Sequence, residues 1–100
     1  MPYRYALAQH GTTLATRPFA KRLRDEVIEE AHGQTLVELD FSGVLSASHS
    51  FADEFVAQLA EESQHGSVDF RVTVSGASAS VEERLSKALD RRAVSLFQLA

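Results

Sequence analysis

The stretch from Leu36 to Leu59 constrains the fold more than any other part of this chain. It begins with a hydrophobic run, Leu36 to Phe41, that has the length and composition of a buried strand. A serine-rich crossing from Ser42 to His49 follows, and apolar residues then recur at helical spacing. A strand that leads into a helix in this way predicts an α/β unit with the crossing at the carboxyl end of the strand, where ligands and partners of open α/β sheets tend to bind.

The sequence pattern places the start of this helix at Ser50. Ser50 followed by Asp53 fits the arrangement in which a serine oxygen caps backbone amides and an acidic side chain three residues on reaches back. Asp53 and Glu54 also bring negative charge to the first turn, where the helix dipole favours it. We therefore expect Ser50 to be the N-cap, and we expect Val44 and Leu45 to point inward and hold the crossing against the body of the protein.

Strand and helix patterns alternate along the rest of the chain. Tyr3 to Ala8 has the alternation of a strand, and so does the run from Val68 to Val74. An amphipathic helix is expected from Pro18 to about His32, with Thr16 as its cap and Gly33 as its stop, and another from Ser80 to about Arg91, with Ser80 as its cap. The apolar tail from Ala93 to Leu99 fits either a last edge strand or a helical turn.

Alternating strands and helices imply crossover connections and a sheet that is largely parallel. With 100 residues the chain has the size of one domain, which buries enough surface for a core of its own. We therefore predict a single α/β domain over residues 1–100, with a mostly parallel sheet of about four strands and three helices packed on it.

Composition narrows the classes of function and location. The net charge of −4 argues against general affinity for nucleic acid, which needs a concentrated positive face. No apolar run approaches the ~20 residues that span a bilayer, the amino terminus lacks a secretory pattern, and there is no cysteine. The expectation is a soluble, cytoplasmic protein that makes no membrane contact.

Motifs for catalysis or cofactor binding are missing from the sequence. The four histidines stand alone without a second ligand at metal-binding spacing, and no glycine-rich phosphate loop follows a strand. Ser48, His49, Ser50 and Asp53 include the residue types of a nucleophilic triad, but they are neighbours along the chain, whereas triad members usually come from separate elements. We therefore expect no enzyme activity, no metal and no cofactor. Asp40, at the end of the central strand, either caps the crossing or has a functional role.

Two short motifs carry a resemblance to a known family. The run from Leu39 to Val44, LDFSGV, followed by Ser48 to Glu54, SHSFADE, resembles the STAS-like group of bacterial domains of unknown function. The run from Gly11 to Arg17, with the helix after it, is similar to the entry of that group into its first helix. The group is in turn similar to the STAS domains of anti-sigma factor antagonists and sulphate transporters.

In the antagonists, an aspartate ends the central strand, and a partner kinase of the histidine-kinase ATPase fold phosphorylates a serine at the start of the next helix. The resemblance implies that Asp40 takes the first position and Ser50 the second. The chain departs from the Asp-Ser-Ser-Gly of the antagonists, since it has Ser48-His49-Ser50-Phe51 there.

The resemblance thus implies a regulatory domain, switched at Ser50, that binds a kinase-like ATPase or anti-sigma factor. The expected partner-binding residues are Asp40, Ser42, Ser46, Ser48, His49, Ser50, Phe51, Asp53 and Glu54. Two alternatives remain. The first is a module that binds a small ligand or nucleotide at the same serine loop, which requires a pocket beside Asp40. The second is a structural unit that forms a homodimer through the apolar tail and the edge strand Tyr3 to Leu7.

Overall fold

A computed structural model describes residues 2–97 and shows a parallel sheet at the base of the molecule. Its strands are β1 (Tyr3–Ala6), β3 (Leu36–Asp40) and β5 (Arg71–Ser75), in the order β1-β3-β5. In the pairing register Tyr5 lies beside Leu39, and Leu39 lies beside Val74. The α/β class and the parallel pairing predicted from the alternation of patterns are confirmed.

The two faces of the sheet differ in polarity because side chains alternate along each strand. Tyr5, Val37, Leu39 and Val72 point inward and are buried. The outer face carries polar groups, among them Glu38, whose carboxylate accepts a hydrogen bond of 2.6 Å from the Ser75 hydroxyl. The apolar core therefore lies on one side of the sheet only.

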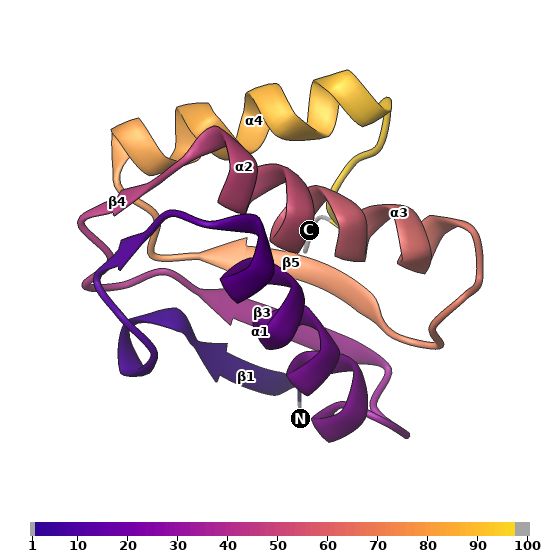
Figure 1. Cartoon of the computed structure of the whole chain (residues 1–100). Coiled ribbons are helices and arrows are strands. Elements are labelled where there is room, and N and C mark those ends of the chain that lie inside the picture. The colour runs from indigo at the N-terminus through magenta and orange to yellow at the C-terminus, as the bar shows by residue number, and fades with distance from the viewer. Residues whose placement is uncertain (1, 98–100) are drawn as a thin grey trace.

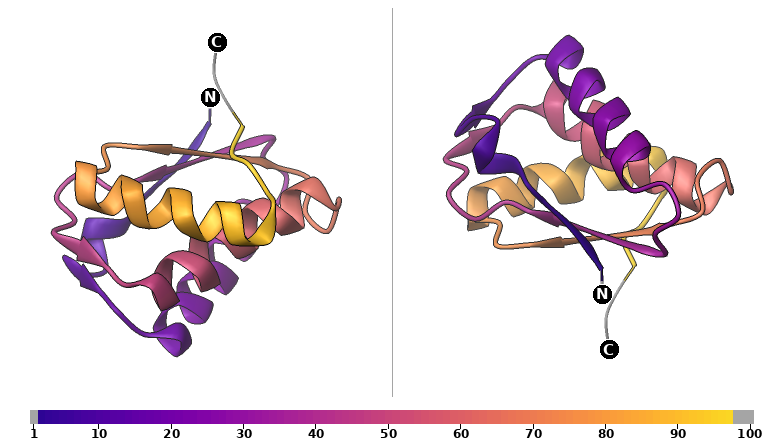
Figure 2. Two further views of the ribbon diagram at one scale, coloured as in Figure 1. Left: turned by 90° about the horizontal axis from the view of Figure 1, so that it is seen from above. Right: turned by 90° about the horizontal axis from the view of Figure 1, so that it is seen from below.

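Apart from the 3-10 turn η1 (Leu7–Gln9) after β1, the helices of the described residues cover this apolar side of the sheet (Figures 1 and 2). They are α1 (Arg17–Glu30), a continuous helix from residue 49 to residue 64, and α4 (Ala79–Arg92). Both crossovers, from β1 to β3 and from β3 to β5, run in the same direction across the sheet, and right-handed crossovers of that kind place their helices on the same face. Thr16 caps α1 as predicted, since its hydroxyl oxygen accepts a hydrogen bond of 3.3 Å from the Phe19 amide.

The middle helix packs between α1 and α4, so it is apolar on two flanks. It consists of α2 (His49–Phe51), the π-helical segment η2 (Ala52–Ala57) and α3 (Gln58–Gln64). Its buried residues are Phe51, Ala52, Phe55, Val56, Ala57, Leu59 and Ala60. The π-helical segment makes most of the contacts with both neighbouring helices, and such segments occur frequently at functional sites.

The strands are divided differently from the predicted sheet of about four, because the main sheet has three strands and a second sheet has two. The small sheet pairs β2 (Thr13–Leu14) with β4 (Ser46–Ala47) in parallel. Strands of two residues are too short to show a period, so β4 was predicted as loop. This small sheet ties the crossing to the segment that leads into α1.

Several smaller details also differ from the prediction. The last strand begins at Arg71, since residues 68–70 bend before it. The cap of α4 is Ser78 and not Ser80, because the Ser78 oxygen accepts from the Val81 amide at 3.3 Å. Leu45 does not point inward: it is 73% exposed, while Val44 is buried as expected.

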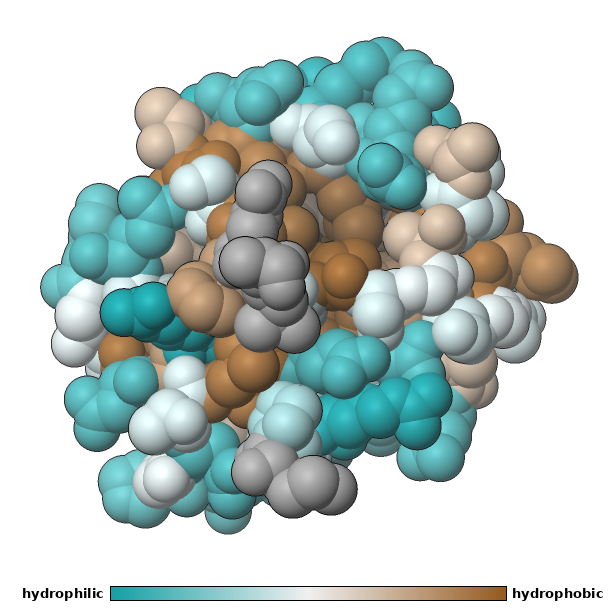
Figure 3. All heavy atoms as spheres, turned by 180° about the vertical axis from the view of Figure 1, so that it is seen from behind, coloured by the Kyte–Doolittle hydropathy of each residue, from teal (hydrophilic) through white to brown (hydrophobic). Residues whose placement is uncertain are grey.

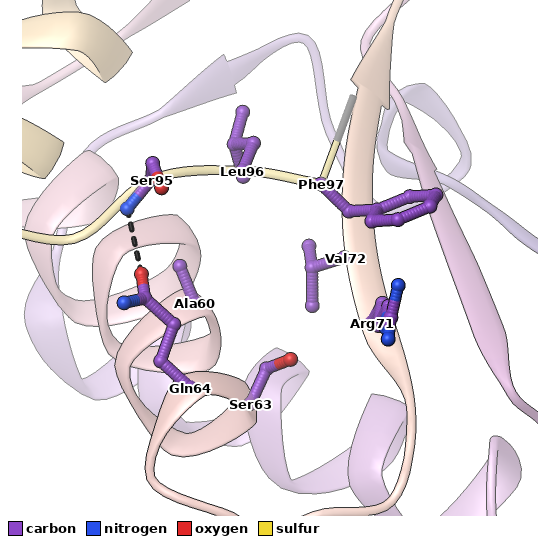
Figure 4. A pocket seen from close by; sticks show the side chains of 8 residues that line it. All are labelled: Ala60, Ser63, Gln64, Arg71, Val72, Ser95, Leu96 and Phe97. Atoms are coloured by element: carbon purple, nitrogen blue, oxygen red, sulfur yellow. Dashed lines mark hydrogen bonds between the residues drawn. The ribbon is translucent and has the colours of Figure 1, made fainter. Parts of the chain in front are cut away.

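The tail after α4 is neither a strand nor a helical turn over residues 94–97, although both were considered, and Leu99 lies outside the described residues. It crosses the free edge of β5, where the Phe97 amide donates to the Val72 carbonyl at 2.8 Å. The Ser95 amide donates to Gln64 Oε1 at 2.7 Å. Beneath the tail lies a cavity of about 550 Å³ between α3 and β5 (Figure 4).

Viewed from behind, this side of the molecule shows apolar residues gathered in its middle and polar residues around them (Figure 3). Leu96 contributes to the cavity under the tail and to a smaller hollow between β5 and α4. Within residues 2–97, no helix has both the length and the apolar character needed to cross a bilayer.

Candidate functional site

The serine-rich crossing joins β3 to the middle helix and lies against the segment before α1. The Leu45 amide donates to the Thr12 carbonyl at 2.8 Å, and the Ser48 amide donates to the Leu14 carbonyl at 2.8 Å. These bonds fix the backbone on both sides of β4. The crossing is therefore an ordered surface, and its side chains at Ser42 and Ser46 are exposed.

Asp40 closes the turn that begins this crossing. Its Oδ1 accepts a hydrogen bond of 2.9 Å from the Ser42 amide, and its other oxygen pairs with Arg4. The Ser42 amide, followed by the charge of Arg4, holds the pKa of Asp40 below its usual range, so the carboxyl is ionised at neutral pH. Asp40 is only 4% exposed. The prediction that Asp40 belongs to a partner-binding surface is therefore corrected. Its buried carboxylate instead holds the turn by accepting from the Ser42 amide.

The N-cap of the middle helix is Ser48, not Ser50. The Ser48 oxygen accepts a hydrogen bond of 3.0 Å from the Phe51 amide, and the same hydroxyl donates to the Ala15 carbonyl. Ser50 is the second residue of the helix and is partly exposed. Among the residues that the structure describes, its hydroxyl has no hydrogen-bond partner. The capping role predicted for Ser50 is thus filled by a neighbour, which leaves the Ser50 hydroxyl available.

Asp53 was predicted to reach back and cap the helix. It does not, because two arginines hold its carboxylate. Arg92 Nε lies 2.7 Å from Oδ1 and Arg92 Nη2 lies 3.1 Å from Oδ2, while Arg17 Nη1 lies 2.9 Å from Oδ2. The hydrogen bonds from Arg92, followed by those from Arg17, lower the pKa of Asp53 to about 2. Asp53 therefore ties the middle helix to α4 and to the first turn of α1.

Glu54 completes this ion cluster. Its carboxylate pairs with Arg24, whose side chain is almost buried, and with Arg17 Nη1 at 3.4 Å. The contact with Arg24 lowers the pKa of Glu54. Arg92 Nη1 also lies 2.6 Å from Glu61 Oε2. We call Arg17, Arg24, Asp53, Glu54, Glu61 and Arg92 the helix cluster; it has equal numbers of positive and negative charges.

Phe51 was assigned to the partner surface and is instead fully buried. Its ring lies 5.3 Å from that of Phe55 and 6.2 Å from that of Phe19, measured between centroids. A residue enclosed in this way contributes to the packing of α1 on the middle helix. It supports the surface from below and does not touch a partner directly.

His49 is the first residue of the middle helix and is partly exposed. Burial of the ring, followed by the nearby charges of Arg84, Arg91 and Lys87, lowers its pKa. Its Nδ1 atom is enclosed and has no hydrogen-bond partner among residues 2–97. The neutral imidazole is therefore favoured at neutral pH, and the ring borders the basic side of α4.

Five of the predicted residues are accessible along the crossing. We define the crossing surface by these five residues, which are Ser42, Ser46, Ser48, His49 and Ser50. Asp53 and Glu54 are held in the helix cluster one turn further along. Among residues 2–97, no three His, Cys, Asp or Glu side chains are placed to hold a metal ion.

Sequence reasoning missed two features next to this surface. Leu45 is largely exposed beside β4, and α4 presents basic residues near His49. The basic residues of α4 could have been found in the sequence, because Arg84, Lys87 and Arg91 have the spacing of one helical flank. No sequence signal distinguished Leu45 from the buried Val44 before it.

Comparison with known proteins gives a family but no relative of known function. No curated protein and no solved structure matches the chain significantly. The family model described as "STAS-like domain of unknown function (DUF4325)" matches residues 20–82, which include most of α1, β3, the crossing, the middle helix and β5. The match covers more than half of the sequence, and the chain accordingly belongs to this family of STAS-like domains of unknown function.

Proposed function

We propose that this domain is a regulator without catalytic activity that binds a protein partner through the crossing surface and is switched by phosphorylation of Ser50. The observation that carries the proposal is the state of the Ser50 hydroxyl. It is partly exposed, it is not used as the helix cap, and it lies in the first turn of a helix. A modification there changes the surface without removing a bond that the fold needs.

A phosphate fits this position electrostatically. It adds about −1.5 to −2 charges at neutral pH, and negative charge is favoured in the first turn of a helix. The carboxylates of Asp53 and Glu54, one turn away, would repel it if they were free. Both are paired with arginines of the helix cluster, which offsets that repulsion. The phosphate therefore alters the surface that a partner contacts more than it alters the stability of the fold.

The class of partner rests on the resemblance to anti-sigma factor antagonists. It favours an ATPase of the histidine-kinase fold or an anti-sigma factor, which would meet this domain in the bacterial cytoplasm. Adjacent genes offer an inexpensive check, since a kinase-like ATPase encoded next to this protein is the expected arrangement.

The proposal is tested by mass spectrometry of the protein isolated from its native cells under several growth conditions. The expected result is a population heavier by one phosphate, with the phosphate on the fragment that carries Ser50. Ser50→Ala should abolish it. Ser80→Ala is the matched control, because Ser80 is also the second residue of a helix capped by a serine two positions earlier. Protein that never carries phosphate at Ser50 contradicts the switch.

A further inference from the structure

One flank of α4 carries a row of basic residues. Arg84, Lys87 and Arg91 are separated by three and four positions, so they lie along the same side of the helix, and all three are exposed. Lys87 has a solvent-exposed ion pair with Glu83 at 3.1 Å. No ion pair of Arg84 or Arg91 is found within residues 2–97. We call these three residues the basic flank.

The basic flank borders the crossing surface. The helix α4 packs against β4, which lies within the crossing, and against α2, which follows it (Figures 1 and 2). The charges of all three basic residues contribute to the lowered pKa of His49, the first residue of α2. The basic flank therefore adjoins the crossing surface at its His49 end.

This area has the opposite charge to the chain as a whole. The net charge is −4, yet the basic flank is positive. Arg17, Arg24 and Arg92 are neutralised within the helix cluster. Within the basic flank Lys87 is paired with Glu83, so the charges of Arg84 and Arg91 are the ones left to attract a negatively charged partner.

Leu45 supplies an apolar contact at the edge of the same area. It directly precedes β4, the strand that α4 packs against, and it is the large hydrophobic residue that residues 2–97 leave exposed. Aliphatic side chains that stand out from a polar surface can fill an apolar recess in a partner. Positive charge beside one apolar anchor is the pattern that an acidic protein segment with an apolar side chain would match.

We infer that the basic flank and Leu45 extend the crossing surface into a docking site for an acidic segment of a partner protein that carries an apolar side chain. The location rests on the proposed function, but the docking does not depend on phosphorylation. A nucleic acid is less well matched, because this area offers an aliphatic anchor and the chain repels polyanions overall. A phosphate on Ser50, next to His49, would add negative charge beside the docking site and weaken the binding of an acidic segment.

The test is a titration of the isotope-labelled protein, followed by backbone NMR, with a short glutamate-rich peptide that has a central leucine. The expected amide shifts are at Leu45, His49 and the basic flank. They should weaken when salt is raised, because the charges are exposed. The same peptide with glutamine in place of glutamate is the matched probe and should bind at least about tenfold more weakly.

A second experiment reverses the charge of two residues of the basic flank. Arg84→Glu with Arg91→Glu should weaken peptide binding by about tenfold or more. Lys21→Glu with Arg22→Glu makes the same change in net charge on the exposed side of α1 and should alter binding by less than about twofold. The dispersion of the amide signals reports whether the charge-reversed variant is folded. If it is not, the neutral variant Arg84→Gln with Arg91→Gln is used in its place.

Three results would overturn the docking site. The first is shifts at Lys21 and Arg22 as large as those at the basic flank. The second is unchanged affinity in both α4 variants. The third is tighter binding of a single-stranded oligonucleotide than of the peptide. Failure here is distinct from failure of the switch: peptide binding at the basic flank without any phosphate at Ser50 removes the switch alone, and phosphate at Ser50 without peptide binding removes the docking site alone.

Discussion

Arg92, in the last turn of α4, holds both carboxylate oxygens of Asp53 in the π-helical segment, at 2.7 Å and 3.1 Å. Its remaining nitrogen reaches Gln58 at 2.5 Å and Glu61 at 2.6 Å. The two elements are separated by β5 in the chain, and this side chain adds a polar link to their apolar packing. The contact fixes how α4, and with it the basic flank, lies against the middle helix.

Arg92→Ala should destabilise the protein by about 2 to 3 kcal/mol, because it leaves partly buried carboxylates without their partner. Arg92→Lys should recover only part of the loss, since an ammonium group cannot bind both oxygens in the same way. Denaturation in urea measures both. Lys21→Ala, which removes an exposed pair with Asp25, is the control and should change stability by less than about 0.5 kcal/mol. An equal effect of the two substitutions would show that the bidentate contact contributes little.

Acid should weaken the same link. The pKa of Asp53 is about 2 in the folded protein, below its ordinary value of 3.8, so the stabilisation is complete above about pH 5 and is lost as the pH falls toward 2. The shift corresponds to about 2 kcal/mol at neutral pH. Asp53→Asn should therefore cost about that much at neutral pH and almost nothing near pH 2. The free energy of unfolding of the wild type and of Asp53→Asn is measured between pH 2 and pH 7. A difference between the two proteins that stays constant with pH would contradict the role of the Asp53 carboxylate.

The residues that cap the middle helix can be told apart by paired substitutions. Ser48→Ala removes the oxygen that accepts from the Phe51 amide and should cost about 1 kcal/mol or more. Ser50→Ala removes a hydroxyl with no partner among the described residues and should change stability by less than about 0.5 kcal/mol. Thermal unfolding of both variants makes the comparison. A larger loss for Ser50→Ala would reverse the assignment of the cap.

The sequence alone could not show whether Ser48 or Ser50 caps the middle helix, and the reason is physical. Ser48 and Ser50 both fit a local capping pattern, whereas Thr16 was predicted correctly because Pro18 leaves it without a competitor. What selects Ser48 is distant in the chain: its amide and hydroxyl bind the carbonyls of Leu14 and Ala15. Local patterns do not contain such contacts.

The same limit explains the other differences in the fold. The parallel sheet and the three helices follow from hydrophobic period, which a single sequence displays. The pairing of β2 with β4 joins two strands of two residues each, and their contact depends on the path of the chain between them. The helix cluster likewise joins arginines from the start of α1 and the end of α4 to Asp53, so its members became visible as a group only in three dimensions.

Glycine positions offer a test of the turn that Asp40 closes. Gly76 has φ +69°, and a Cβ there would overlap Ser42 Oγ and lie 2.8 Å from Asp40 Oδ1. Gly76→Ala should therefore destabilise by about 3 kcal/mol, from backbone strain and overlap together. Gly66 has a similar φ of +78° with nothing within 4 Å, so Gly66→Ala should cost only about 1 kcal/mol. Equal losses in urea denaturation would mean that the contacts of Gly76 do not constrain the turn.

The proposed function requires that the crossing surface bind a protein partner and that charge at Ser50 control the binding. The most direct measurement is quantitative recovery of cross-linked partners from native cells that express the wild type, Ser50→Ala, Ser50→Asp or Ser67→Asp. Ser67 is an exposed serine in the turn after α3, at the opposite end of the middle helix. One partner should be recovered with the wild type, Ser50→Ala and Ser67→Asp and be lost with Ser50→Asp. Recovery of the same proteins by all four would contradict it.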